Sequence, residues 1–463
     1  MKSRSLPHRP LAALALGAFL LAGCSMMPAY QRPAAPVPGD WPAASADAGT
    51  AATELPWQQF FTDERLRRLI AIALANNRDL RVAILNIEQA RAQYDIRSAD
   101  RLPSVGAQVT GSRVPSSSGG TNSSYAAGLA FTAWEIDLFG RIASLSEAAL
   151  AQYLASEEGR KAAQTSLVAT VATTWLGLVA DQELIELTRQ TLATREESLR
   201  LAKLRFDNGV TSELDFRQAQ SLAETARVTL AQLTRQQAVD LNTLALLLGQ
   251  AVPPDPGVAA TTASVNLPDL PAGTPSEVLT RRPDVRQAEQ QLIAANANIG
   301  AARAAFFPRI SLTAGVGTAS GELSGLFKGG SWGFTVAPQL IQPIFDAGRN
   351  RAGLASATAA RDIAIAQYER AIQSAFREVS DALAGRATFG EQLRAQSAVA
   401  EAEAARYRLS ELRYHNGIAS YLDLLDAQRS LFAARQALVQ TRLAQLQNQV
   451  LLYRALGGGW TGS

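Results

Sequence analysis

Several segments of the chain place an apolar residue at every second position, which is the pattern of a β-strand with one apolar face. In residues 310–317, Ile, Leu, Ala and Val alternate with Ser, Thr and Gly. Three more segments alternate in the same way, and Trp134 and Trp332 lie near the ends of two of them. Strands of about ten such residues are typical of transmembrane β-barrels, although a half-buried soluble sheet has the same alternation. We therefore predict strands at about 105–113, 124–137, 310–319 and 332–342.

Two long proline-free regions predict helices of unusual length. No proline occurs from 116 to 252 or from 344 to 463, and a proline inside a helix costs about 3 kcal/mol. A continuous helix of 66 residues would be roughly 100 Å long. Because an average helix has only about 11 residues, such helices must run along an elongated assembly. We expect long helices at 141–206 and 349–414, followed by helices at 212–249 and 420–457.

The chain is internally duplicated. Residues 204–210 (LRFDNGV) recur as residues 412–418 (LRYHNGI), an offset of 208, and this register continues to the Leu-Gly pairs that begin at 248 and 456. Each half has the same order of elements: a helix, two strands, a long helix and a further helix. We predict a first repeat over 63–256, a linker over 257–275 and a second repeat over 276–460.

The first residues have the pattern of a bacterial lipoprotein signal. A basic start precedes the apolar run 11–22, which is too short to span a bilayer as a helix, and the single cysteine, Cys24, lies at the expected cleavage site. We expect residues 1–23 to be removed, Cys24 to carry lipid, and the Pro/Ala-rich residues 24–62 to form a tether. An ordinary secretory signal with an incidental cysteine is the alternative. Cleavage removes three of the 44 Lys and Arg residues, and the remaining 41 equal the 41 Asp and Glu residues. The basic charge of the whole chain therefore does not indicate nucleic-acid binding.

The composition excludes several kinds of site. With one Cys and two His, neither a His/Cys zinc site nor a disulfide framework can be built. A Ser-His-Asp triad would depend on His415, because His8 lies in the signal segment. No catalytic constellation is visible, so a lipid-anchored periplasmic enzyme and a structural lipoprotein are weaker hypotheses. Alanine, roughly one residue in five, favours closely packed helices.

Four strands cannot form a closed barrel alone, because the smallest single-chain barrels have about eight. Open strand edges are excluded from lipid, where each unpaired backbone group costs several kcal/mol. If the strands cross a membrane, other copies must complete the barrel. Two copies would give eight strands with little lumen, and three would give twelve strands around a water-filled bore.

Six short motifs occur along the chain: WQQFF at 57–61, WEIDLFGR at 134–141, RPD at 282–284, FFPRISL at 306–312, YLDLLDAQRS at 421–430 and LYRALGGGW at 452–460. Together they resemble the TolC family of outer-membrane efflux ducts, most closely its lipoprotein branch, typified by OprM. The resemblance covers residues 55–460. It implies an α+β membrane protein, a homotrimer in which four strands per chain form a shared 12-strand β-barrel in the outer membrane. A long periplasmic α-helical barrel would continue it.

This resemblance also implies a function, the passive export of drugs or other small molecules. A periplasmic adaptor (membrane fusion) protein and an inner-membrane resistance-nodulation-division pump would be its partners. No cofactor is expected apart from the lipid on Cys24, and no metal, nucleic acid or enzymatic activity. An exit duct for protein secretion or for metal-ion efflux is the alternative. After cleavage, methionine remains only at Met26 and Met27, so the bore would have no methionine ladder for soft metals.

The turns that follow the two long helices form the first candidate site. Asn-Gly at 208–209 and at 416–417 suits the left-handed conformation that ends a helix, and the Ser-x-x-Asp sequences that follow suit the start of the next helix. Turn formation alone explains these residues locally, and the resemblance adds that such tips dock the adaptor. The predicted docking residues are Asn208, Gly209, Val210, Thr211, Ser212, Asn416, Gly417, Ile418, Ala419 and Ser420.

A closed periplasmic aperture is the second candidate site. Leu422, Asp426 and Arg429 have the i, i+4, i+7 spacing that places residues on one helix face. In a trimer, three Asp426 carboxylates would lie near the axis, where like charges repel unless a donor such as Arg429 satisfies them. The first repeat has Gln218 at the position of Asp426, so the ring would come from one repeat only. An ordinary surface pair, worth under about 0.5 kcal/mol, is the alternative, and the family resemblance favours the gate.

Overall fold

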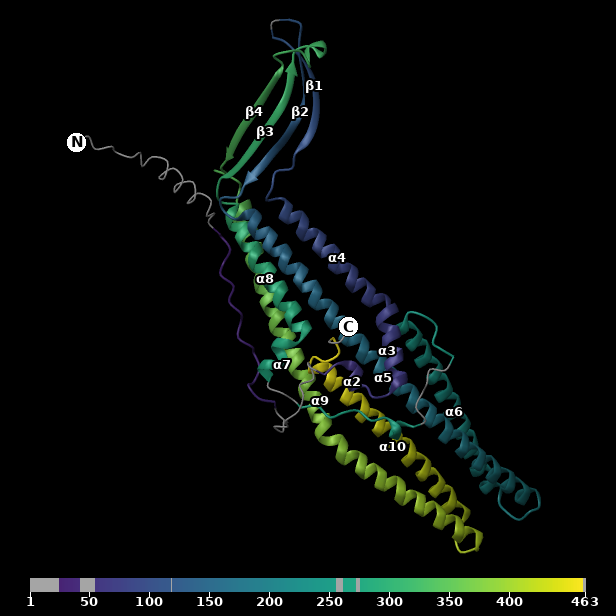
Figure 1. Ribbon diagram of the computed structural model, residues 1–463. Helices are drawn as coiled ribbons and strands as arrows, with labels where there is room; N and C mark the ends of the chain where they lie inside the picture. The colour runs from purple at the N-terminus through teal and green to yellow at the C-terminus, as the bar shows by residue number, and fades with distance from the viewer. Residues whose placement is uncertain (1–24, 42–54, 118, 255–260, 272–274, 461–463) are drawn as a thin grey trace. The chain divides into compact units, whose positions relative to one another are not determined.

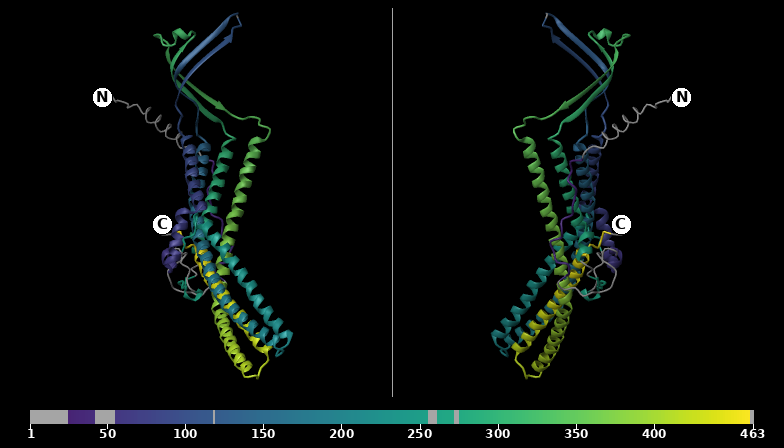
Figure 2. Two further views of the ribbon diagram at one scale, coloured as in Figure 1. Left: turned by 90° about the vertical axis from the view of Figure 1, so that its right-hand side faces the viewer. Right: turned by 90° about the vertical axis from the view of Figure 1, so that its left-hand side faces the viewer.

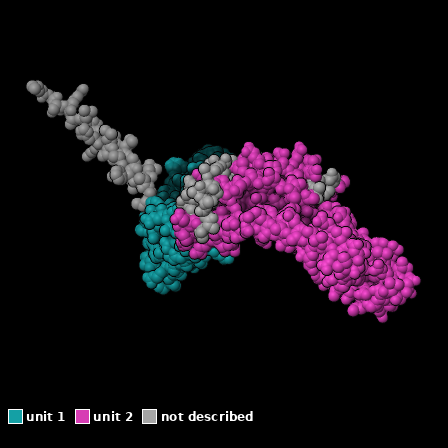
Figure 3. All heavy atoms as spheres, turned by 90° about the horizontal axis from the view of Figure 1, so that it is seen from below, with its two compact units in different colours: residues 1–35, 85–157, 287–370 teal, residues 36–84, 158–286, 371–463 magenta. Residues whose placement is uncertain are grey.

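The computed structural model describes residues 25–41, 55–117, 119–254, 261–271 and 275–460. Figure 1 shows the elements in chain order. The chain divides into two compact units, coloured separately in Figure 3. Unit 1 comprises residues 1–35, 85–157 and 287–370, and unit 2 comprises residues 36–84, 158–286 and 371–463.

The first repeat contains α3 (Glu64–Asn76), α4 (Arg78–Ala99), β1 (Gly106–Pro115), β2 (Thr121–Ile136), α5 (Arg141–Asp207) and α6 (Glu213–Leu248). The second contains α7 (Pro275–Arg281), α8 (Pro283–Ala304), β3 (Arg309–Ser320), β4 (Trp332–Ile341), α9 (Arg349–His415) and α10 (Tyr421–Ala455). Three short helices complete the described elements: α2 (Trp57–Phe60), η2 (Thr262–Ser264) and η3 (Leu323–Gly325).

The four strands of unit 1 form one antiparallel sheet in the order β1-β2-β3-β4. Figure 2 shows the twist of this sheet from two sides. Its register places apolar residues of neighbouring strands side by side: Leu129 pairs with Val316, and Val316 pairs with Phe334. Because side chains alternate between faces, this register gives the sheet one continuous apolar face and one face of small and polar residues.

The two outer strands are exposed along their whole length. All ten residues of β1 and all ten of β4 are solvent-exposed within the chain. Large apolar side chains are among them, with Val109 80% and Phe334 83% exposed. Within the described residues, the outer edges of β1 and β4 therefore lack a pairing strand, and the apolar face lacks a cover.

Each long helix begins at an aspartate cap in unit 1. Asp137 accepts hydrogen bonds from the backbone N–H groups of Arg141 and Ala143, both at 2.7 Å. Asp346 accepts from Gly348 and Asn350, both at 2.9 Å. These carboxylates satisfy amides that a helix start otherwise leaves unpaired. The helices then run for 67 residues each. By length and composition α5 could cross a membrane, but 61% of its apolar window is buried inside the chain, as in a core helix.

The residues that follow Cys24 lie along α8 in unit 1. Arg32 forms a two-pronged ion pair with Glu289, at 2.7 and 3.0 Å, and the Tyr30 hydroxyl donates to the same carboxylate at 3.0 Å. Further along α8, the Asn296 amide donates to the carbonyl of Pro28 at 2.8 Å. This part of the expected tether is therefore fixed to the fold by specific side-chain contacts.

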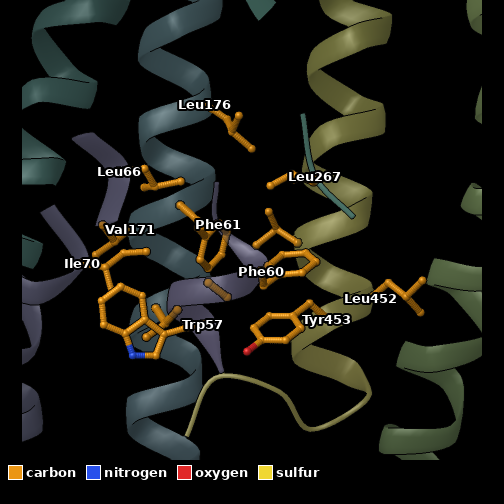
Figure 4. Packing of buried hydrophobic residues seen from close by; sticks show 14 of the residues in the cluster. Trp57, Phe60, Phe61, Leu66, Ile70, Val171, Leu176, Leu267, Leu452 and Tyr453 are labelled. Atoms are coloured by element: carbon orange, nitrogen blue, oxygen red, sulfur yellow. The ribbon is translucent and has the colours of Figure 1, made fainter. Parts of the chain in front are cut away.

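The core of unit 2 is formed around aromatic residues of α2 and of the end of α10 (Figure 4). The rings of Phe60 and Tyr453 stack with their centroids 4.0 Å apart, and the Tyr453 hydroxyl donates to the carbonyl of Leu55 at 2.7 Å. Phe60, Phe61 and Trp175 are fully buried. The expected tether extended to residue 62, whereas its last residues belong to this core.

A buried ion-pair network joins three helices of unit 2. Arg282 is 6% exposed and donates to Asp284 at 2.6 Å, to Glu378 at 2.9 Å and to the carbonyl of Ala455 at 2.8 Å. Burial would raise the pKa of Asp284, but its hydrogen bonds with Arg282 and the charge of that guanidinium lower the pKa below the ordinary value. The RPD motif therefore supplies a compensated buried charge.

A second buried ionisable group in unit 2 has no opposite charge beside it among the described residues. Asp181 of α5 is 7% exposed, and its Oδ2 has no hydrogen-bond partner among the described residues. Asp240 of α6 packs against the same part of α5. A Cβ added at Gly177, one helical turn before Asp181, would lie 3.3 Å from the Asp240 Oδ2. Burial first, and the charge of Asp240 second, raise the pKa of Asp181 to about 7.

The substitution Asp181→Asn should raise the thermal unfolding midpoint more at pH 8 than at pH 5. An unfolded aspartate has a pKa of about 3.9, while the folded carboxyl keeps its proton up to about pH 7. Between these values the folded state binds more protons, so this group lowers stability as pH rises. Asparagine does not ionise and removes the effect. The exposed control Glu186→Gln should change the unfolding midpoint by the same amount at both pH values. An equal change at both pH values in Asp181→Asn would contradict the interpretation.

Candidate functional site

Figure 2 shows the two hairpins of unit 2, α5–α6 and α9–α10. The hydrogen bonds of their turns follow the same pattern. Each glycine amide bonds to the carbonyl three residues earlier, at 2.9 Å for Gly209 and 3.0 Å for Gly417. The next amide bonds five residues back, at 2.8 Å for Val210 and 2.9 Å for Ile418. The glycines have φ of +69° and +72°. This is the Schellman end of a helix, which a glycine at positive φ favours.

The polar residues of the turns are already used within them. The side chains of Asn208 and Asn416 each donate to the carbonyl four residues earlier, at 2.7 Å. Ser420 forms a capping box with Asp423, and Ser212 caps α6 by accepting from the amide of Asp215. Hydrogen bonds from Thr211 and Ser212 lower the pKa of Asp215. Turn formation thus accounts for most of the polar residues predicted to dock a partner.

The apolar residues of the turns are instead exposed. Val210 and Ile418 are 73% and 68% exposed, and one turn into the next helices Leu214 and Leu422 are 66% and 56% exposed. A Cβ added at Gly209 or Gly417 would meet no atom within 4 Å. Both tips therefore offer apolar surface and open space for a partner.

The two hairpins touch just before their turns. The guanidinium of Arg205 in α5 lies 5.7 Å from the ring centre of Tyr414 in α9 and donates to its hydroxyl. Beside this contact is a cavity of about 360 Å³, whose lining includes Asp215, Glu411 and Tyr421. His415, the single histidine among the described residues, lines the same cavity.

The three residues of the predicted aperture lie on α10. Leu422 and Arg429 are exposed and Asp426 is partly buried. The carboxylate of Asp426 pairs with Arg406 of α9, which also donates to the hydroxyl of Ser430 at 3.3 Å. Arg429 has no hydrogen bond or ion pair with any described residue, so it is not the donor that satisfies Asp426 within one chain.

The sequence analysis missed Arg406, although the hairpin itself provides a signal. Arg406 lies 11 residues before Gly417 and Asp426 lies nine after it, so an antiparallel hairpin brings the two opposite each other. The corresponding positions of the first repeat are Ser198 and Gln218. The ion pair is therefore specific to the second repeat.

The remaining predicted site residue is Cys24, the expected lipid attachment point. It lies just outside the described part of the chain, next to Ser25, the first described residue. Within that part, no group of three or more His, Cys, Asp or Glu side chains is placed to hold a metal ion.

The model of the family described as outer membrane efflux protein matches residues 69–250 and 274–458, one match in each repeat. The chain belongs to this family. The family's channels are not enzymes, and the resemblance to the TolC family indicated by the six motifs is confirmed. The predicted fold of four antiparallel strands and long helices in two repeats is confirmed as well.

Relatives and solved structures of the family resemble the chain over nearly its full length. The chain is 49% identical to TtgC of Pseudomonas putida, a probable efflux pump outer membrane protein, over 98% of this chain and 96% of that one. It is 47% identical to outer membrane protein OprJ of Pseudomonas aeruginosa, over 97% and 95% of the two chains. The fold matches the open state of the MtrE outer membrane channel of Neisseria gonorrhoeae with a TM-score of 0.87 and 42% identity, covering 94% and 99% of the chains.

Proposed function

We propose that the protein is the outer-membrane exit duct of a tripartite efflux pump and passes drugs or other small molecules passively to the cell exterior. The observation that carries this proposal is the sheet of unit 1, which has an apolar face and two unpaired edges. Two 67-residue helices continue from the same strands. A transmembrane barrel extended by a helical conduit needs both features.

Three copies would give this sheet the closure that lipid demands. Pairing β1 of one copy with β4 of the next satisfies both edges, and three copies make a barrel of 12 strands with room for a bore. Trp332 pairs with Thr318, and Trp134 pairs with Leu312. These rows are six residues apart on β3, or about 20 Å along the strand. With strands tilted by roughly 40°, the two rings would lie about 15 Å apart along the barrel axis, inside the roughly 25 Å apolar band of such barrels.

Partners and substrates follow from the names of the relatives. TtgC is a probable efflux pump outer membrane protein and SrpC a solvent efflux pump outer membrane protein, both from Pseudomonas putida. This supports a periplasmic adaptor and an inner-membrane resistance-nodulation-division pump as partners of our chain. The names of these relatives favour drug or solvent efflux over the alternatives of protein secretion and metal-ion efflux. A wide passive duct selects little, so we assign substrate selection to the pump.

The membrane attachment extends this proposal to the N-terminus. Lipid on Cys24 would lie a few residues before Tyr30 and Arg32, whose side chains bind Glu289 of α8. A lipid held by so ordered a segment would add a second attachment to the outer membrane besides the barrel.

The assembly can be tested on protein extracted from membranes in detergent. Electron microscopy should show a three-fold particle with a helical extension on the order of 100 Å, and mass spectrometry of the same sample should find the lipid on Cys24. A compact monomer would refute the duct. An unmodified Cys24 in a three-fold particle would refute only the anchor.

The two hairpin tips are the proposed docking surface for the adaptor. A bulky side chain at Gly209 and Gly417 would project into open space, so Gly209→Trp with Gly417→Trp should block docking and abolish adaptor cross-linking in cells. Asparagine adopts positive φ more readily than other side chains. The matched control Gly209→Asn with Gly417→Asn should therefore keep both turns and the cross-link. Persistent cross-linking and drug resistance in the tryptophan variant would show that docking occurs elsewhere.

The Arg406–Asp426 pair and Leu422 are the proposed closure of the periplasmic aperture. Arg406→Gln leaves Asp426 without its guanidinium, and neighbouring copies would then repel through their carboxylates. This variant, and Asp426→Ala, should raise single-channel conductance in planar bilayers. Glu213→Gln breaks an exposed ion pair with Arg217 at the other tip and should leave conductance unchanged. An unchanged conductance in Arg406→Gln and Asp426→Ala would rule out this gate.

A further inference from the structure

The guanidinium of Arg195 is buried between helices of unit 2 without an acidic partner. Arg195 lies on α5 and is 3% exposed. One of its terminal nitrogens donates to the carbonyl of Leu222 in α6 at 3.0 Å, and the group lies 5.0 Å from the ring centre of Phe432 in α10. Its Nε has no hydrogen-bond partner, and no carboxylate of the described residues is among the groups that act on its charge.

Such an arrangement is unfavourable for an arginine. Taking a guanidinium out of water costs several kcal/mol unless a counter-charge and hydrogen bonds compensate for it. The other buried arginine of the described chain, Arg282, has two carboxylates within 2.9 Å. Burial first, and the positive charge of Arg429 second, lower the pKa of Arg195, which shows that its surroundings disfavour the charge they enclose.

A cavity of about 200 Å³ lies beside Arg195, between α5 and α10. Arg435 of α10 and Tyr407 of α9 also line it, and no aspartate or glutamate does. The hydroxyls of Thr191 and Thr194 in its wall already donate to backbone carbonyls. Gln190 and the Tyr407 hydroxyl, also in the lining, donate to Glu186 and Glu411, both at 2.9 Å. The two guanidiniums are therefore the charged donors that the lining offers to a ligand, beside the neutral amide of Gln428.

We infer that this cavity binds a small oxyanion, such as phosphate or a free carboxylate, between Arg195 and Arg435. The planar fork of an arginine matches the oxygens of carboxylate and phosphate, and a bound anion would provide the missing counter-charge. It would also join α5, from the first hairpin, to α10, from the second. The neighbouring 360 Å³ cavity is lined by three carboxylates, those of Glu197, Glu411 and Asp215, against the single arginine Arg205, so its net negative charge disfavours an anion there.

The test uses the intact protein in detergent and titrates it with inorganic phosphate, and separately with acetate, at constant ionic strength in chloride. Isothermal titration calorimetry should show one saturable site per chain. Arg195→Gln and Arg435→Gln should each weaken binding roughly tenfold or more, because each removes a charged hydrogen bond. Arg189→Gln removes an exposed arginine of the same helix and should leave binding unchanged.

Two results would overturn the inference. One is the absence of saturable binding of either anion to the unmodified protein. The other is that Arg435→Gln binds the anion as tightly as the unmodified protein does. Because Arg435 is exposed, this variant keeps the test valid even if Arg195→Gln fails to fold. If neither anion binds but Arg195→Gln makes the oligomer dissociate at lower temperature, a carboxylate of a second copy supplies the counter-charge instead.

Discussion

An unpaired strand edge in hydrocarbon leaves a row of backbone N–H and C=O groups without hydrogen-bond partners, each at a cost of several kcal/mol. The sheet of unit 1 presents two such edges, and its apolar face makes it equally unsuited to water. Neither problem can be solved by a single chain with four strands. In the proposed assembly, the need for closure would determine the oligomer, and the Asp137 and Asp346 caps start the long helices that follow the strands. In this view the long helices depend on the barrel, because copies held together by their strands bring helices together along the same axis.

Much of this architecture could be predicted from the sequence because it rests on local rules. Period-two alternation identified the strands, the absence of proline identified the long helices, and the 208-residue offset identified the repeats. These signals describe one chain element at a time. They could not place Trp57, Phe60 and Phe61 in the core of unit 2, because the partner of Phe60 is Tyr453, nearly 400 residues later. A short aromatic motif beside a Pro-rich segment gives no local indication that it is buried.

Comparison of the two repeats distinguishes residues that form the hairpin turns from residues with an additional role in one repeat only. Both hairpins share Asn-Gly and Ser-x-x-Asp, and the same hydrogen bonds explain them in both places. Arg406 and Asp426 have no counterpart in the first repeat, where Ser198 and Gln218 occupy those positions. Since the turn of the first repeat forms with the same hydrogen bonds but without such an ion pair, a hairpin of this kind does not need the pair in order to fold. Helix-face spacing pointed to Arg429 as the donor because it considers one helix only, whereas within one chain the partner of Asp426 is Arg406, across the turn.

Buried charges in unit 2 divide into two classes, and the division bears on how the unit could move. Arg282 is fully compensated and joins the start of α8 to α9 and the end of α10. Asp181 and Arg195, both on α5, face α6 and α10 without an opposite charge. Segments that change conformation are generally drawn from the less stable parts of a fold. Uncompensated Asp181 and Arg195 weaken the packing of α5 against α6 and α10. If the hairpins shift when a duct opens, α5 is therefore the helix that moves at the lowest cost. A proton on Asp181 or an anion beside Arg195 would change the free energy of this packing.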